Sequence, residues 1–360
     1  MPTDLILVLD RRDTDVRLDG RALRVKHGDA PPAHIPLGVV GQVIVHGAPR
    51  VSCDVWRALA ERGVPAVLQP GRGRGATAMI GAALGGTIEL RAAQHRAADD
   101  PAAALRISAH LLRAKLRAQM QAARHLSGLP PPLPTAADLS PLERALNDGQ
   151  DRIDRARTPA ALMGAEGAAA AAWYRWLAAW LPTDWGFGGR NRRPPRDPLN
   201  ALLSLGYTLL AGEVLGAVQQ AGLDPARGFL HGTVPGRESL VLDLMEALRP
   251  AVDLVAIGLL FDWLDRTDFS NSPAEGCRLA KPARGVFYQR WALARGDWPQ
   301  LLPPPAPARS QPAPPTQAAD TDATTAPTTA EPQDHSLPRQ CRWRVEALRE
   351  WLRPHLRAGD

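Results

Sequence analysis

The hydrophobic periodicity changes near residue 100, and this change constrains the fold of the chain more than any other feature of its sequence. Before it, short apolar runs such as 5–9 alternate with turn residues, and Asp19-Gly20 separates two of these runs. Such runs predict β-strands, and an Asp-Gly pair between them predicts a hairpin. Beyond it, apolar residues recur at helical spacing. The sequence therefore predicts an α+β fold, with a small N-terminal, mainly β domain (1–95) followed by a larger all-α domain (96–302).

Local signals place the elements of the first domain. A short helix is expected from Cys53 to Arg62, because Ser52 is a favourable N-cap and Gly63 favours a helix end. After the first run, strands are expected at 16–18, 23–25, 43–45, 66–68 and 87–90.

The second domain is expected to consist of long helices. One begins near Pro101, and proline-rich residues 127–135 end it. The run Ser140-Pro141-Leu142-Glu143 restarts a helix with an N-cap serine, a first-turn proline and a capping-box glutamate. Further helices are expected at about 159–181, 198–222 and 239–265.

The end of the chain has a different composition. Residues 303–340 are rich in Pro, Ala, Thr and Gln, and such a segment buries too little apolar surface to offset the entropy of ordering it. We expect a disordered linker there. Residues 341–360 predict an amphipathic helix, which needs a partner surface to be stable and is expected to dock on the helical domain.

The chain is basic. Lys and Arg exceed Asp and Glu by 43 to 37, which gives a net charge of +6 and a pI near 9.8. That sign of charge is compatible with a polyanionic partner. Only three of the basic residues are lysines, and a chain also rich in Ala, Gly and Pro has the composition of a GC-rich genome. Only arginines at particular positions therefore support phosphate recognition.

Other features limit the class of protein. Its three cysteines lie far apart, which argues against both a disulfide framework and a zinc knuckle. The sequence has no Gly-rich phosphate loop and no Gly-x-Ser-x-Gly elbow. We find no leader-like start and no run of about 20 consecutive apolar residues, so we expect a cytoplasmic protein without a membrane partner.

Four residues form a candidate catalytic set. Glu166 lies near the start of a strongly apolar helix, where it could simply complement the helix dipole. His231 ends an apolar connection between helices, a place where many histidines are hydrogen-bonded core residues. Asp243 and Glu246 lie on one face of an apolar helix, which is either solvated or, if buried, in need of a cation.

The donor types indicate which ion such a set would bind. Two carboxylates and one imidazole suit Mg²⁺ or Mn²⁺ better than zinc. Such an ion can polarise a phosphodiester and activate a water or hydroxyl nucleophile, which is nuclease or strand-transfer chemistry. A basic loop before the next helix is a candidate DNA contact, although it could also be an ordinary solvated connection; its arginines are Arg190, Arg192, Arg193 and Arg196.

These segments together resemble the CRISPR-associated protein one family, the spacer-integrating nuclease of bacterial and archaeal adaptive immunity. Met163-Gly164-Ala165-Glu166-Gly167 is similar to the family's first catalytic segment, and 197–207 is similar to its central helix. The run from Gly222 to His231 is similar to the second catalytic segment, and 242–246 to the third. They occur in the family's order over about residues 1–300, and the 303–340 insertion departs from the family pattern.

The resemblance implies an activity, ligands and partners. It assigns Glu166, His231 and Glu246 as metal ligands, and Asp243 as a helper carboxylate. It implies a homodimer that works with the small CRISPR-associated protein two. The pair would insert a double-stranded DNA fragment into a CRISPR repeat by attack of its 3′-hydroxyl ends on a phosphodiester.

Two other functions are compatible with part of this evidence. A non-catalytic DNA-binding scaffold would use the basic loop and need no metal. Another metal-dependent, structure-selective DNA nuclease, such as a junction resolvase, would keep the metal site and lack the integration partner.

Overall fold

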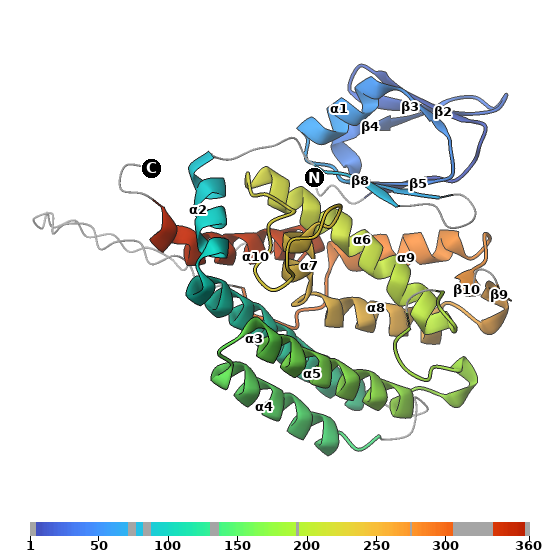
Figure 1. Ribbon diagram of the computed structural model, residues 1–360. Helices are drawn as coiled ribbons and strands as arrows, with labels where there is room; N and C mark the ends of the chain where they lie inside the picture. The colour runs from blue at the N-terminus through green and yellow to red at the C-terminus, as the bar shows by residue number, and fades with distance from the viewer. Residues whose placement is uncertain are drawn as a thin grey trace, which may run out of the picture.

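A strand-rich N-terminal part and a larger helical part make up the molecule (Figure 1), which confirms the α+β class. The computed structural model describes residues 5–70, 77–81, 88–129, 137–191, 194–273, 276–304 and 334–356.

Two four-stranded sheets form the N-terminal part. The first has the order β1-β5-β7-β8, with the first three strands parallel and the last antiparallel. The second has the order β4-β3-β2-β6, and its β2-β3 hairpin forms as predicted, with its turn one residue later, at Gly20-Arg21. One helix, α1 (Cys53–Glu61), lies in the predicted place. The strands are β1 (Leu5–Leu9), β2 (Thr14–Asp19), β3 (Ala22–His27), β4 (Ala33–Pro36), β5 (Val40–His46), β6 (Arg50–Val51), β7 (Ala66–Gln69) and β8 (Ala78–Ile80).

The first sheet is buried on both faces. Side chains alternate across a strand with a period of two residues. Leu7 and Val43 therefore point into the core of the N-terminal part, while Ile6 and Ile44 join the core of the helical part. This sheet consequently attaches the two parts of the molecule through continuous apolar packing.

The helical part is built around α6. In Figure 1, α6 and α9 lie between the strands and the bundle of α3, α4 and α5. The helices are α2 (Ile88–Asp99), α3 (Pro101–Ser127), α4 (Ser140–Arg155), α5 (Pro159–Trp180), α6 (Pro198–Gln220), α7 (Ser239–Met245), α8 (Arg249–Asp262), α9 (Arg284–Gly296) and α10 (Leu337–Leu352).

The position of α6 explains its composition. Among the described residues it is the one helix long and apolar enough to cross a membrane, yet 72% of its most apolar window is buried inside the protein. A helix that is apolar on all sides and packed on all sides is a core helix.

Three local predictions are wrong. Residues 88–90 begin α2 instead of forming a strand, because the segment packs as a helix against α3. The expected helix at 239–265 is divided into α7 and α8, and Pro250 at the start of α8 cannot continue a preceding helix. The helical part also contains a two-stranded sheet of β9 (Phe269–Ser272) and β10 (Gly276–Leu279), so it is not all-α.

The C-terminal helix docks as predicted, but it begins earlier. α10 packs against α6, α2 and α9, with Leu337, Leu348 and Leu352 fully buried. Residues 337–340, which we expected to belong to the linker, form its first turn, in which Leu337 is fully buried and Gln340 Nε2 donates to Gln300 Oε1 at 2.7 Å. Most of the predicted linker, 305–333, lies outside the described residues.

Candidate active site

Four charged side chains from four segments meet in the helical part. Lys115 lies on α3, Glu166 on α5, Glu246 directly follows α7, and Arg249 opens α8. Lys115 Nζ donates to Glu166 Oε1 and to Glu246 Oε2, the latter at 2.6 Å. Arg249 Nε donates to the other oxygen of Glu246 at 3.0 Å. Each carboxylate is therefore bound by a cation.

Electrostatics keep Glu246 and Lys115 ionised. Burial alone would raise the pKa of Glu246, but the neighbouring Lys115 ammonium and Arg249 guanidinium outweigh it and lower that pKa to about 2. Burial likewise disfavours the charged form of Lys115, but the carboxylates of Glu246 and Glu166 outweigh that effect and raise its pKa. Glu246 thus carries its negative charge at neutral pH.

Glu246 and Arg249 lie on either side of the break between α7 and α8. Glu246 is the C-terminal cap of α7, and Arg249 begins α8 three residues later. Residues three apart also neighbour each other on a continuous helix, so the spacing itself favours this ion pair. The two side chains pair near Lys115.

Asp243 organises the loop that carries His231. Its side chain is fully buried and accepts hydrogen bonds from the backbone N–H groups of Phe229, Leu230 and His231, at 2.6, 3.0 and 2.9 Å. The same carboxylate lies 2.7 Å from His231 Nδ1. Gly228 permits this approach, because a Cβ there would lie 2.8 Å from the Asp243 carboxylate. The imidazole is therefore held by one nitrogen, with the other free to face a ligand.

The predicted ligands come together only in part. Glu166 and Glu246 share the Lys115 ammonium, and His231 shares a hydrogen bond with Asp243. Where the structure describes the chain, no three His, Cys, Asp or Glu side chains lie close enough together to hold a metal ion. The predicted cage is thus present as two pairs, with an ammonium between the carboxylates.

Sequence reasoning missed Lys115 and Arg249. A signal for Lys115 was present: it follows Leu112 by three residues and precedes Leu116, on the buried stripe of α3. A lysine on such a stripe needs a carboxylate partner. A signal for Arg249 was also present, because it follows Glu246 by three residues, a spacing at which opposite charges pair on a helix.

The predicted DNA-binding arginines divide into three groups. Arg190 turns inward, where its guanidinium donates to Asn200 Oδ1 at 2.7 Å and to Ser204 Oγ at 3.3 Å. Arg196 is exposed. Arg192 and Arg193 lie outside the described residues.

Two buried residues hold this arginine loop in place. Asp197 caps α6 by accepting from Asn200 N at 2.8 Å, and Asn200 Nδ2 donates to Gly189 O at 2.8 Å. Asn200 Oδ1 also accepts from Asn191 N at 3.0 Å. The loop is therefore tied to the start of the core helix.

A buried polar network lies behind Arg249. The Tyr207 ring lies near two guanidinium groups, that of Arg249 at 4.8 Å and that of Arg190 at 5.5 Å. Its hydroxyl donates to Asp253, which also accepts from Trp173 Nε1 at 2.8 Å. Burial raises the pKa of Asp253 to about 6, although the two hydrogen bonds oppose the increase. The network thus connects the arginine loop with the residue that binds Glu246.

We expect Asp253 to make stability depend on pH. Folding raises its pKa from 3.8 to about 6, so the folded state binds a proton more tightly than the unfolded state. This contributes roughly 3 kcal/mol to the free energy of unfolding below pH 4, and the contribution is lost as the pH rises through 6. Between pH 4 and 7, the unfolding free energy measured with urea should therefore fall in the wild type relative to Asp253→Asn. A pH-independent difference would contradict this assignment.

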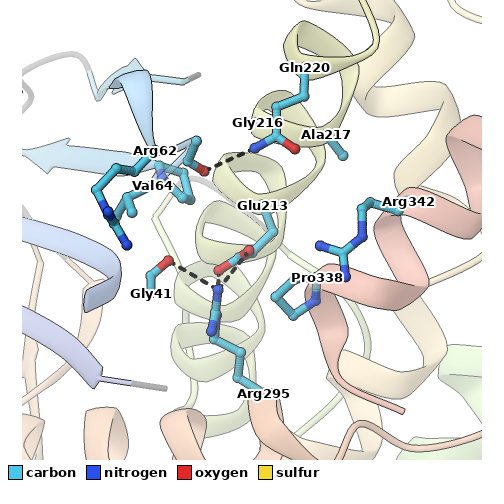
Figure 2. Close-up of a pocket in the computed structure, with 12 residues that line it drawn as sticks. Gly41, Arg62, Val64, Glu213, Gly216, Ala217, Gln220, Arg295, Pro338 and Arg342 are labelled. Carbon is cyan, nitrogen blue, oxygen red and sulfur yellow. Dashed lines mark hydrogen bonds and ion pairs between the residues drawn. The ribbon is translucent and has the colours of Figure 1, made fainter. Parts of the chain in front are cut away.

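A separate cavity lies between the two parts of the molecule. It has a volume of about 210 Å³ and is lined by β5, α6, α9 and α10 residues (Figure 2). Its wall contains a buried ion pair, in which Arg295 Nε donates to Glu213 at 2.7 Å. None of the candidate catalytic residues lines this cavity. It is smaller than most ligand pockets. We therefore place the candidate active site at the cluster of four charged side chains that contains Lys115.

Sequence comparison finds one family over most of the chain. The family model described as CRISPR associated protein Cas1 matches residues 7–292. A Rhodospirillum rubrum protein named CRISPR-associated endonuclease Cas1 2 is 35% identical over 292 residues, which cover 77% of this chain and 82% of the relative. A Thermus thermophilus protein named CRISPR-associated endonuclease Cas1 3 is 49% identical over 141 residues, which cover 38% of this chain and 42% of that protein.

Solved structures share the fold. A casposase bound to an integration product has a TM-score of 0.74 at 20% identity, with 96% of this chain and 90% of that chain covered. A Cas1 protein from Thermotoga maritima has a TM-score of 0.74 at 19% identity, with 97% of each chain covered. A Cas6-RT-Cas1–Cas2 complex has a TM-score of 0.71 at 21% identity, with 97% of this chain and 35% of that chain covered. At these identities the likeness concerns the fold alone.

Proposed function

Because this chain belongs to the Cas1 family of CRISPR-associated proteins, we propose that it is a divalent-metal-dependent DNA endonuclease and integrase. It would insert short DNA fragments into a CRISPR repeat array. One observation carries this proposal: Glu166 and Glu246 converge on a single cation position beside α7, the helix whose Asp243 holds His231.

Glu166, His231 and Glu246 would hold Mg²⁺ or Mn²⁺. The fit is supported by the buried cation that the two carboxylates already bind, and by the low pKa of Glu246, which keeps that ligand charged. The hydrogen bond from His231 Nδ1 to Asp243 leaves Nε2 for a metal, an arrangement typical of histidine ligands. Oxygen-rich donor sets with one imidazole suit these hard ions.

The chemistry supplied by a bound ion would be polarisation of a phosphodiester and activation of a 3′-hydroxyl or water nucleophile. The chain's own residues prepare the site for it. Asp243 fixes the orientation of His231, and Arg249 fixes one oxygen of Glu246. Arg196, with Arg192 and Arg193, would contact DNA phosphates without reading sequence.

The proposed partners are DNA, a second copy of this chain and the small CRISPR-associated protein two. A net charge of +6 is compatible with a DNA partner. Two relatives in fold support the choice: the casposase is described with an integration product, and another relative is described in a complex with Cas2.

One assay tests the proposal. Purified protein and its small partner are incubated with a short duplex and a repeat-bearing plasmid, with Mn²⁺ or with a chelator. Joining is expected with Mn²⁺, and it should be lost with the chelator or in His231→Ala. Salt-sensitive DNA binding without any product would favour the scaffold function instead. Cleavage of branched DNA without joining would favour a structure-selective nuclease.

A further inference from the structure

The Lys115 ammonium lies where the proposed metal ion would have to bind. Its Nζ donates to both acidic ligands of the proposed cage, Glu166 and Glu246. Lys115 is only 6% exposed, so solvent screens its charge weakly. A divalent ion and an ammonium on the same oxygens would repel each other strongly in such a poorly screened interior.

We propose that Lys115 is a positioning residue that serves as the counter-ion of the metal-free cage and competes with the metal for Glu166 and Glu246. This inference rests on the proposed function, because it takes those two carboxylates as metal ligands. Metal entry displaces the ammonium, and no covalent bond forms or breaks.

The residue type fits this role. Lysine is rare in this chain, with Lys26 and Lys281 as its other two examples, while arginine makes up the rest of the 43 basic residues. An ammonium is a compact charge with three donors on a flexible stem, whereas a guanidinium is a flat fork that binds one carboxylate through two parallel bonds. A compact ammonium can sit between two carboxylates as an ion does, and its stem can move it aside.

The charge balance of the cluster also fits. In the metal-free protein, Glu166 and Glu246 are offset by Lys115 and Arg249, so the four side chains sum to zero. A divalent ion makes the cluster positive. The site then attracts an anionic phosphodiester only after the metal has bound.

Metal affinity provides the first test. Mn²⁺ binding to the metal-free, full-length protein is measured by calorimetry for the wild type, Lys115→Met and the exposed-site control Lys281→Met. Loss of the competitor is expected to lower the Kd for Mn²⁺ by about tenfold or more, a change worth about 1.4 kcal/mol. Lys281→Met should bind as the wild type does. Equal or weaker binding by Lys115→Met would overturn the inference.

A second measurement uses the unaltered protein, and it decides the matter even if Lys115→Met does not fold. The chain has three lysines, so mass spectrometry can follow reductive methylation of each one. Mg²⁺ is expected to increase labelling of Lys115 at least severalfold and to leave Lys26 and Lys281 unchanged. Labelling of Lys115 that does not respond to Mg²⁺ would overturn the inference.

A third variant separates the two possible failures. If Glu246→Gln binds Mn²⁺ as tightly as the wild type, both the proposed metal ligands and the role proposed for Lys115 are wrong. If Glu246→Gln loses binding while Lys115→Met shows no gain, the cage stands and only the role of Lys115 is wrong.

Discussion

Glu246→Gln is expected to reduce Mn²⁺-dependent joining and cleavage of DNA by more than about 100-fold. The amide keeps the size of the side chain and removes the charge that Lys115, Arg249 and a metal ion would share. Loss of groups that only support metal ligands typically costs 10- to 100-fold, so loss of a ligand should cost more. Initial rates of joining, measured over a range of Mn²⁺ concentrations, check this expectation.

Glu213→Gln is a matched control for that experiment. Both glutamates are 5% exposed and bind a buried cation, but Glu213 pairs with Arg295 beside the cavity between the two parts of the molecule (Figure 2). Either substitution leaves a buried cation with less compensation, which typically costs about 3–5 kcal/mol of stability. We therefore expect both variants to melt at lower temperature and only Glu246→Gln to lose activity. Equal loss of activity in the two folded variants would refute a specific role for Glu246.

Asp243→Ala is expected to lower both stability and activity. The change leaves three backbone N–H groups, two of them on buried residues, and the His231 ring without their acceptor. Each unsatisfied buried donor costs about 1–3 kcal/mol, and relaxation of the loop recovers part of this, so we expect a total loss of at least roughly 3 kcal/mol. Urea unfolding measures the loss, and the joining assay measures the activity.

His231→Ala separates the two effects of Asp243. It removes the imidazole but keeps the three backbone donors on Asp243, so we expect activity to fall with little change in unfolding free energy. If His231→Ala destabilised the protein as much as Asp243→Ala, the histidine would be a structural residue. If Asp243→Ala were as stable as the wild type, the role assigned to its buried carboxylate would be wrong.

Local pattern predicted the elements that depend on local interactions. The β2-β3 hairpin follows from Asp19-Gly20, where Gly20 has a positive φ of 57°. The helices α5 and α6 follow from apolar residues at helical spacing. These signals act between neighbours in the chain, so they can be read without the tertiary structure.

Local pattern failed where packing decided the outcome. The four residues 87–90 alternate like a strand, but 88–99 as a whole covers α3 as a helix. Apolar spacing also continues across the break between α7 and α8, so periodicity alone could not reveal it. Glu246 and Arg249 pair across this break at a spacing of three residues, a spacing that also favours such a pair within a helix.

The sequence by itself determined the order of strands and helices and the carboxylates and imidazole available for chemistry. Only the tertiary structure decided how those groups are paired. Lys115 lies 51 residues from Glu166 and 131 from Glu246, and their contact depends on how α3, α5 and α7 pack. Hydrophobic periodicity reports which face of a helix is buried, whereas the energy of a buried charge depends on its distance in space from other charges. For that reason the change of period near residue 100 predicted the fold class, while the ammonium between the two carboxylates emerged only from the packed helices.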